Sequence, residues 1–411
     1  MHNTRLTVET VQEDEGSTTL ELFFDLVFVF ALTQITSLMA GDLTGRGIVR
    51  GVLVMAIVWW CWVGYSWLGN LVKADEGVSR VAMFVAMAGM FLIALSVPES
   101  FADFSGGLSG PVVFAVGYLV VRGVHVVLMF IASADDAGLR RQVQLFGATM
   151  AGSTALLLVA SQTSGVVQTL LWLAVVLVDY GGTLLIGNKG WRINSAEHFA
   201  ERHGLIFIVA LGESIVAIGL GVADQPVSWP IVVATMLGLS VSASLWWAYF
   251  DTAALRAHQE LKERHDHDRV SMAQHAFTYL HLPMLVSIVL ISLGLKKVLE
   301  YVGDESDHEL SEPLPGVPLA ALLGGVALFL VAHAAFGRRT HGAVTPPHLV
   351  LAVVLLAAIP LATQVPAIGA LAGVATLLVI LNAAVWSRER HDRADVRHRH
   401  REDAATIEIP R

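Results

Sequence analysis

Two acidic side chains lie one helical turn apart near the start of the first long apolar segment. Glu21 and Asp25 belong to the motif ELFFD, and their four-residue spacing places them on one face of a helix. We expect them to meet the polar side chains around the start of a later apolar segment, which are His198, Glu201, Arg202 and His203. The pattern is compatible with a proton or cation vestibule and equally with a structural ion-pair cluster.

A third acid, Glu213, falls at the centre of an apolar segment. It is the thirteenth of 22 residues in 201–222, between Gly212 and Ser214. Glycine allows a neighbouring helix to approach closely, and the serine hydroxyl is available for a hydrogen bond. An ionisable group at this depth is costly unless it has a partner or a function. We predict that Glu213 carries a proton or cation; the alternative is a protonated carboxyl that bonds a neighbouring helix.

Arg122 and Asp179 also interrupt apolar segments. Arg122 is the twelfth residue of the fourth segment, on the helix face of Tyr118 and His125. Asp179 is the fourteenth residue of the sixth segment. Both segments run in the same direction, so the two charges lie about 3 Å apart along the membrane normal. We predict an ion pair between them, which either fixes helix register or gates the helix bundle.

Two further polar residues are candidates for a solute or ion pathway. Asp251 follows a run of aromatic residues at the end of the eighth apolar segment, where an interface anchor is the simpler interpretation. His281 lies inside the ninth segment, and Pro283 predicts a kink beside it. Cys61 is the single cysteine, so the sequence predicts neither an intramolecular disulfide nor a cysteine-based metal site. We expect no cofactor.

The segments that carry these side chains are long enough to cross a bilayer. Of the 411 residues, 55% are hydrophobic and 15% are charged, against about 25% charged in soluble domains. A membrane helix needs about 20 consecutive apolar residues. The sequence therefore predicts an all-α integral membrane protein with about twelve spans: 19–40, 51–70, 81–98, 111–132, 143–161, 166–187, 201–222, 230–250, 272–295, 317–336, 347–363 and 367–386.

The distribution of basic residues tests this number of spans. With twelve spans, 21 of the 26 Lys and Arg residues fall on one set of alternating loops and termini, four fall on the other set, and Arg122 lies within a span. Basic loops are cytoplasmic, which places both termini in the cytoplasm. We predict a polar N-terminal segment at 1–18, a membrane domain at 19–387 and a charged cytoplasmic tail at 388–411. No basic patch of the nucleic-acid-binding type is present.

An internal duplication would divide the spans into two parallel halves of six. Glu21 and Glu201 open the first and seventh spans, and pairs of tryptophans, Trp59-Trp60 and Trp246-Trp247, fall in the second and eighth. The sequence offsets are 180 and 187, which are similar but unequal. A 6+6 parallel repeat remains one possible organisation of the membrane domain.

Two stretches of the sequence resemble the signatures of the bacterial low temperature requirement protein A family. They are LELFFDLVFVFALTQITSL at 20–38 and EHFAERHGLIFIVALGESIVAI at 197–218; YFD at 249–251 and Y-x-H at 279–281 are also similar. The resemblance covers roughly 18–390 and implies a multi-spanning membrane protein of a family named for a growth phenotype. The residues at its matching motif positions are Glu21, Asp25, Glu201, Arg202, Gly212, Glu213, Ser214, Tyr249, Asp251 and His281.

These features favour a secondary transporter or permease, coupled to protons or cations, for a small solute of unknown identity. An ion channel and a membrane-embedded enzyme or lipid-handling protein are the alternatives. The sequence contains no Walker A motif, no H-E-x-x-H and no G-x-S-x-G. Transport driven by ATP through this chain alone and an embedded metalloprotease activity are therefore disfavoured. The expected partners are the lipid bilayer of the cell membrane and the solute or ion.

Overall fold

The computed structural model describes residues 11, 13, 16–304 and 308–388. Eleven helical spans in this part of the chain are long and apolar enough to cross a membrane. Every predicted span coincides with helical structure, which confirms an all-α polytopic membrane protein. The eleventh predicted span corresponds to α14 (Pro346–Ala362), whose 17 residues extend about 26 Å, slightly less than the hydrocarbon core.

The orientation of the termini and the internal duplication stay predictions. The predicted tail at 388–411 lies outside the described residues apart from Arg388, and of the N-terminal segment only residues 11, 13 and 16–18 are described. The chain divides into two compact units, with boundaries inside α8 and beside α11. The first unit extends to Val209 and includes His265–Ala273, and the second contains Ala210–Arg264 and the chain from Gln274 onward.

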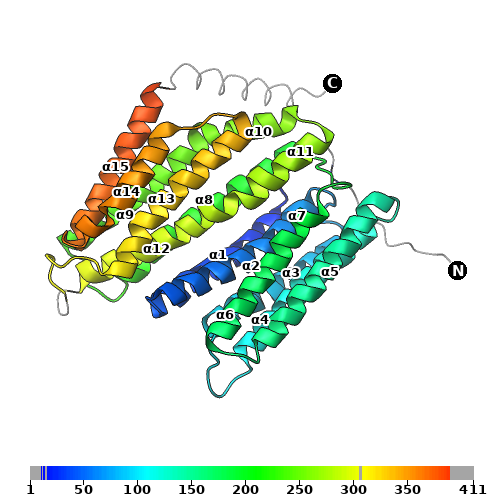
Figure 1. Cartoon of the computed structure of the whole chain (residues 1–411), viewed down its shortest axis with the longest axis horizontal. Helices are drawn as coiled ribbons and strands as arrows, with labels where there is room; N and C mark the ends of the chain where they lie inside the picture. The colour runs from blue at the N-terminus through cyan, green and yellow to red at the C-terminus, as the bar shows by residue number, and fades with distance from the viewer. Residues whose placement is uncertain (1–10, 12, 14–15, 305–307, 389–411) are drawn as a thin grey trace. The chain divides into compact units, whose positions relative to one another are not determined.

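The first unit is a helix bundle in which α1 packs against α2 and α3, α3 against α4, and α5 against α4 and α6 (Figure 1). Its helices are α1 (Thr19–Gly41), α2 (Gly45–Gly69), α3 (Gly77–Ser96), α4 (Gly110–Ala132), α5 (Ala137–Ala160), α6 (Gly165–Val176), α7 (Gly182–Ile186), the first half of α8 (Ala196–Gly221) and α11 (Asp266–Met272). A π-helical segment, Leu177–Gly181, joins α6 to α7. A short 3₁₀ turn, Val97–Glu99, follows α3.

Helix α2 is the centre of the first unit. Every residue from Leu53 to Gly69 is buried, and the helix packs against α1, α4 and α6. A helix that is apolar on all sides is suited to such a position, since no face has to meet water or lipid headgroups. Trp59 and Trp62 stack with ring centroids 4.8 Å apart inside this core. Polar groups that neighbouring helices direct toward α2 therefore lie away from solvent.

The second unit contains the remaining half of α8 and the later helices. These are α9 (Trp229–Ala248), α10 (Ala254–Glu263), α12 (His281–Gly303), α13 (Gly316–His341), α14 and α15 (Ala367–Arg388). π-Helical segments at Tyr249–Ala253 and Ala273–Tyr279 precede α10 and α12. Within this unit α13 packs against both α12 and α14, its neighbours in sequence (Figure 1).

Glycines bring α12 and α13 into backbone contact. A Cβ atom on Gly294 would lie 2.6 Å from Leu322 Cβ, 2.9 Å from its Cα and 3.0 Å from its N. On the facing helix, a Cβ on Gly325 would lie 3.1 Å from the backbone nitrogen of Ile291. Small residues allow such close approach in membranes, where dispersion between helices replaces the hydrophobic effect as a driving force.

The variant Gly294→Ala is therefore expected to lower the free energy of unfolding by about 1–3 kcal/mol, because backbone atoms must separate to admit one methyl group. Gly324→Ala is the matched control, since a Cβ on Gly324 meets nothing within 4 Å. Thermal unfolding in detergent should show a lower midpoint for Gly294→Ala and an equal or higher midpoint for Gly324→Ala. Equal midpoints for both variants would contradict the close packing of α12 and α13.

Candidate functional site

The first turns of α1 and α8 carry matched acidic and basic residues. Glu21 and Asp25 are the third and seventh residues of α1, and His198 and Arg202 are the third and seventh residues of α8. The two helices meet in register, with a constant sequence offset of 177. One helical turn separates the two pairs, because residues i and i+4 lie above one another. These four residues are called the acid–base cluster below.

The pairs in the acid–base cluster are close and buried. His198 Nε2 lies 3.0 Å from each carboxylate oxygen of Glu21. Arg202 Nη2 donates to Asp25 Oδ1 over 3.0 Å, and Arg202 Nε lies 4.0 Å from Glu21 Oε1. Each of the four residues is at most 2% exposed. At such burial a charge needs a partner, so the two acids and two bases depend on one another.

Trp62 of α2 contacts both members of the second pair, Asp25 and Arg202. Its indole Nε1 donates to Asp25 Oδ1 over 2.7 Å, and the Arg202 guanidinium lies 5.3 Å from the centroid of its ring. Asp25 Oδ2 and the Nε and Nη1 atoms of Arg202 are buried without a hydrogen-bond partner in the described part of the chain. The cluster therefore retains donor and acceptor capacity for a further polar group. No sequence pattern predicted the hydrogen bond of Trp62 to Asp25.

Asn70 determines the tautomer of His198. Asn70 Oδ1 accepts the backbone N–H groups of Asn194 over 2.7 Å and Ser195 over 3.3 Å, which fixes the orientation of the amide. Asn70 Nδ2 donates to the Ser195 carbonyl oxygen and lies 3.5 Å from His198 Nδ1. With an amide N–H directed at it, Nδ1 is the acceptor nitrogen, and Nε2 donates to Glu21.

Local backbone structure positions the first pair. Thr18 and Glu21 form a capping box, in which Glu21 Oε2 accepts the Thr18 N–H over 2.9 Å and the Thr18 hydroxyl accepts the Glu21 N–H over 3.3 Å. Ser195 caps α8 by accepting the His198 N–H over 3.0 Å. Gly69 makes room for the pair, because a Cβ there would overlap Glu21 Oε1. No local sequence pattern pointed to Gly69, which contacts the cluster only through the tertiary fold.

A polar pocket of about 230 Å³ lies beside the acid–base cluster. Its lining includes His198 at the start of α8, and Lys73, Asp75 and Glu76 from the loop between α2 and α3. An adjoining smaller pocket reaches Glu21. These residues lie at the membrane face that the charge distribution predicts to be cytoplasmic. The two pockets therefore contact both members of the first pair, His198 and Glu21.

A second cluster of buried polar residues surrounds Asp179. Its carboxylate accepts hydrogen bonds from the hydroxyls of Tyr118 over 2.7 Å and Ser153 over 2.8 Å. Arg122 instead directs Nη1 at the Trp60 carbonyl oxygen, 3.5 Å away. Asp179 attracts Arg122 electrostatically, but no direct ion pair joins them among the described residues. The predicted contact is therefore wrong, because equal depth in the membrane does not place two side chains on facing sides of their helices.

The aromatic surroundings of Arg122 explain how its charge is accommodated. The guanidinium lies 4.3 Å from the centroid of the Phe146 ring, a geometry in which the ring face attracts a cation. Its Nε and Nη2 atoms are buried without a hydrogen-bond partner in the part of the chain that is described. Asp179 itself sits in the π-helical segment between α6 and α7, a helix distortion that frequently occurs at functional sites.

Other predicted site residues form hydrogen bonds with partners outside the acid–base cluster. Glu201 is exposed on α8 and accepts the Ser17 N–H over 2.8 Å. Glu213 is 1% exposed and belongs to the second unit. Its neighbour Ser214 exchanges a hydrogen bond of 2.7 Å with Ser242. No group of three or more metal-ligating side chains occurs in the described residues.

A tyrosine–histidine pair also lies within the second unit. The Tyr249 hydroxyl is 2.9 Å from His281 Nε2, and both residues are buried. His281 Nδ1 lies 3.1 Å from the Ala276 carbonyl oxygen, so this nitrogen carries the proton and Nε2 accepts from Tyr249. Asp251 is half-buried in the π-helical segment that follows α9. Asp251 thus lies within one π-helical segment, and His281 lies just after the other.

Comparison with known proteins assigns the chain to a family. The chain is 29% identical over 388 residues to an uncharacterized protein of Rhizobium meliloti (strain 1021), an alignment that covers 89% of this chain and 87% of the relative. The model of the family described as bacterial low temperature requirement A protein (LtrA) matches residues 16–383, a range that contains the entire acid–base cluster. This multi-pass membrane protein therefore belongs to the bacterial low temperature requirement A (LtrA) family.

Proposed function

We propose that this protein is a secondary transporter that couples the movement of a small solute to protons through the acid–base cluster. The observation that carries the proposal is the position of His198, which lines the polar pocket and bonds Glu21 inside the buried cluster. We infer further that it acts in the cell membrane, with the pocket facing the cytoplasm.

The hydrogen bonds suggest how a proton enters. Water in the pocket can deliver a proton to His198 Nδ1 once the 3.5 Å contact from Asn70 Nδ2 is released, and the Nε2 proton then passes to Glu21, 3.0 Å away. Arg202 lies between the two acids, 4.0 Å from Glu21 and 3.0 Å from Asp25. Neutralising Glu21 removes one of the carboxylates that attract Arg202, so the guanidinium is drawn toward Asp25. Proton uptake is thereby linked to a side-chain movement between α1 and α8.

Glu213 is proposed as the acid that carries the proton deeper in the membrane. It lies near the middle of α8 and is 1% exposed, and its flanking glycine leaves space on that helix. An ionisable residue buried at membrane depth is costly and is retained where it has a partner or a function, which makes Glu213 a candidate proton carrier. The acid–base cluster and Glu213 are proposed as two proton-carrying sites, one in each unit.

Proton flux through liposomes tests this proposal. Purified protein is reconstituted with a pH-sensitive dye inside the vesicles, and a membrane potential or a gradient of alkali cations or small solutes is imposed. The wild-type protein should move protons faster than protein-free vesicles under at least one gradient. His198→Gln and Glu213→Gln should each fall to the protein-free rate, because glutamine keeps hydrogen bonding but does not titrate.

Glu260→Gln is the control. Glu260 lies on α10, outside the proposed pathway, and forms a partly exposed ion pair with Arg264 at the end of that helix. The flux of this variant should equal that of wild type. The proposal fails if wild-type protein moves neither protons nor solutes under any imposed gradient. It also fails if both glutamine variants retain the wild-type flux, because the cluster would then be a structural ion-pair network.

A further inference from the structure

A groove lies between α3 and α4, because the two helices touch at one level and are farther apart at the next. A Cβ on Gly117 would lie 2.8 Å from Ile93 Cγ1 and 3.0 Å from the Gly89 carbonyl oxygen. The helices therefore touch at this level. The groove occupies the stretch on one side of the contact, from Val85 back to Val78 on α3, and has a volume of about 610 Å³.

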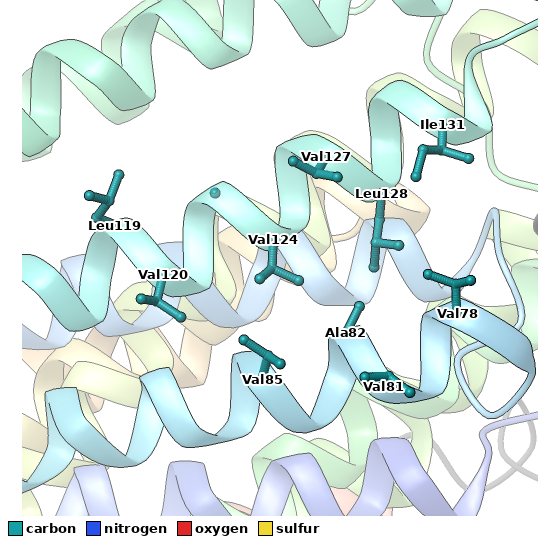
Figure 2. Close-up of a pocket in the computed structure, with 11 residues that line it drawn as sticks. Val78, Val81, Ala82, Val85, Leu119, Val120, Val124, Val127, Leu128 and Ile131 are labelled. Carbon is teal, nitrogen blue, oxygen red and sulfur yellow. The ribbon is translucent and has the colours of Figure 1, made fainter. Parts of the chain in front are cut away.

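The lining of this groove is entirely aliphatic. Eleven residues, all Val, Leu, Ile, Ala or Gly, form its walls, and Figure 2 shows side chains from both helices directed into the space between them. A Cβ on Gly123 would meet nothing within 4 Å, so this glycine keeps one wall open. Val81 is 64% exposed and Val127 is 58% exposed. Such a surface is stable in contact with hydrocarbon.

The length and level of the groove fit one leaflet of a bilayer. On α4 the lining runs from Leu119 to Ile131, twelve residue steps or about 18 Å. Half of the hydrocarbon core is about 15 Å. The groove ends at Val78, the second residue of α3, and at Ile131, the penultimate residue of α4. An occupant of this shape is therefore an acyl chain of the leaflet whose headgroups lie at these helix ends.

Basic side chains lie at the headgroup end. Arg80 is exposed in the first turn of α3, between the lining residues Val78 and Val81. The Arg140 guanidinium lies 4.7 Å from the centroid of the Phe130 ring, next to Ile131. Basic residues at the cytoplasmic surface attract anionic lipid headgroups. We propose that the α3–α4 groove binds an acyl chain of an anionic phospholipid, with its phosphate at Arg80.

One side chain connects this groove with the candidate site. Leu128 lines the groove and also the small inner pocket that reaches Glu21. A bound acyl chain would press on the outer side of Leu128 and keep that wall closed. The lipid would thus seal the buried cluster against the bilayer. This role does not depend on whether the cluster moves protons.

Native mass spectrometry of the purified protein tests the binding. The protein is presented with phosphatidylglycerol or phosphatidylcholine in mild detergent, and the fraction carrying one lipid is measured. Wild-type protein should retain phosphatidylglycerol preferentially. Gly123→Leu, which fills the groove, should lose the bound lipid. Arg80→Gln should bind the two lipids equally, because the phosphate contact is removed while the groove remains.

Two variants serve as matched controls. Gly373→Leu adds the same side chain to an exposed glycine of α15 that has nothing within 4 Å of its Cβ position. Arg338→Gln removes an exposed arginine from the last turn of α13. Both should bind lipid as wild type does. Equal lipid retention by wild type and Gly123→Leu would overturn the proposal. So would a dimer that Gly123→Leu dissociates, since a second copy would then occupy the groove.

Discussion

Replacing Arg202 with methionine is expected to lower the free energy of unfolding by about 3–5 kcal/mol, the range for breaking a buried ion pair. The guanidinium supplies the positive charge for Asp25 at 3.0 Å and for Glu21 at 4.0 Å. Methionine keeps much of the volume but leaves the Asp25 carboxylate at 2% exposure with Trp62 as its remaining donor. Thermal unfolding in detergent, followed as the loss of monodisperse protein, measures the effect.

A second substitution separates charge from packing. The double variant Asp25→Leu with Arg202→Met should recover most of the lost stability, because an apolar pair often replaces a buried ion pair without net cost. Arg192→Met is the control. The Arg192 side chain is 61% exposed and pairs with Asp136, so its loss should change stability by less than about 1 kcal/mol. A double variant no more stable than Arg202→Met would show that Asp25 is not the charge that Arg202 neutralises.

Replacing Asp179 with leucine is expected to have a similar effect, about 3–5 kcal/mol, through the second cluster of buried polar residues. The hydroxyls of Tyr118 and Ser153 lose their acceptor. Arg122 is 1% exposed and loses the acid that attracts it. Unsatisfied polar groups and an uncompensated charge inside a membrane protein are both destabilising. The midpoint of thermal unfolding and the yield of folded protein in the membrane fraction should both fall.

Two double variants distinguish the observed geometry from a direct ion pair. Adding Arg122→Met to Asp179→Leu should restore stability, because no charge then remains. Exchanging the charges, with Arg122→Asp and Asp179→Arg, should restore none. The hydroxyls of Tyr118 and Ser153 would then face an arginine, and the Trp60 carbonyl oxygen would face a carboxylate. Rescue by the exchanged pair would contradict the arrangement in which Tyr118, and not Arg122, binds Asp179.

The acid–base cluster shows how few elements are needed to bury four ionisable groups. Two helices that begin at the same level bring the two pairs together, and one tryptophan and one asparagine from the α2 region orient them. Removing one member leaves the others buried, which makes the cluster sensitive to single substitutions and tolerant of neutral double ones.

The sequence by itself determined the membrane spans and the depth of each polar residue. Both follow from local properties: about 20 apolar residues cross the hydrocarbon core, and each residue advances about 1.5 Å along a helix. Glu21 and Asp25 were therefore placed on one face, at the level where His198 and Arg202 begin α8. The contact between these residues followed from matching levels together with opposite charge.

Only the tertiary structure decided which faces of the helices meet. Arg122 and Asp179 have similar depth, yet the carboxylate faces Tyr118 and Ser153. Trp62 and Asn70 enter the candidate site because α2 lies at the centre of its unit, which no local pattern encodes. Hydropathy and helical rise fix position along the membrane normal, whereas the rotation and neighbours of each helix depend on packing among residues far apart in sequence.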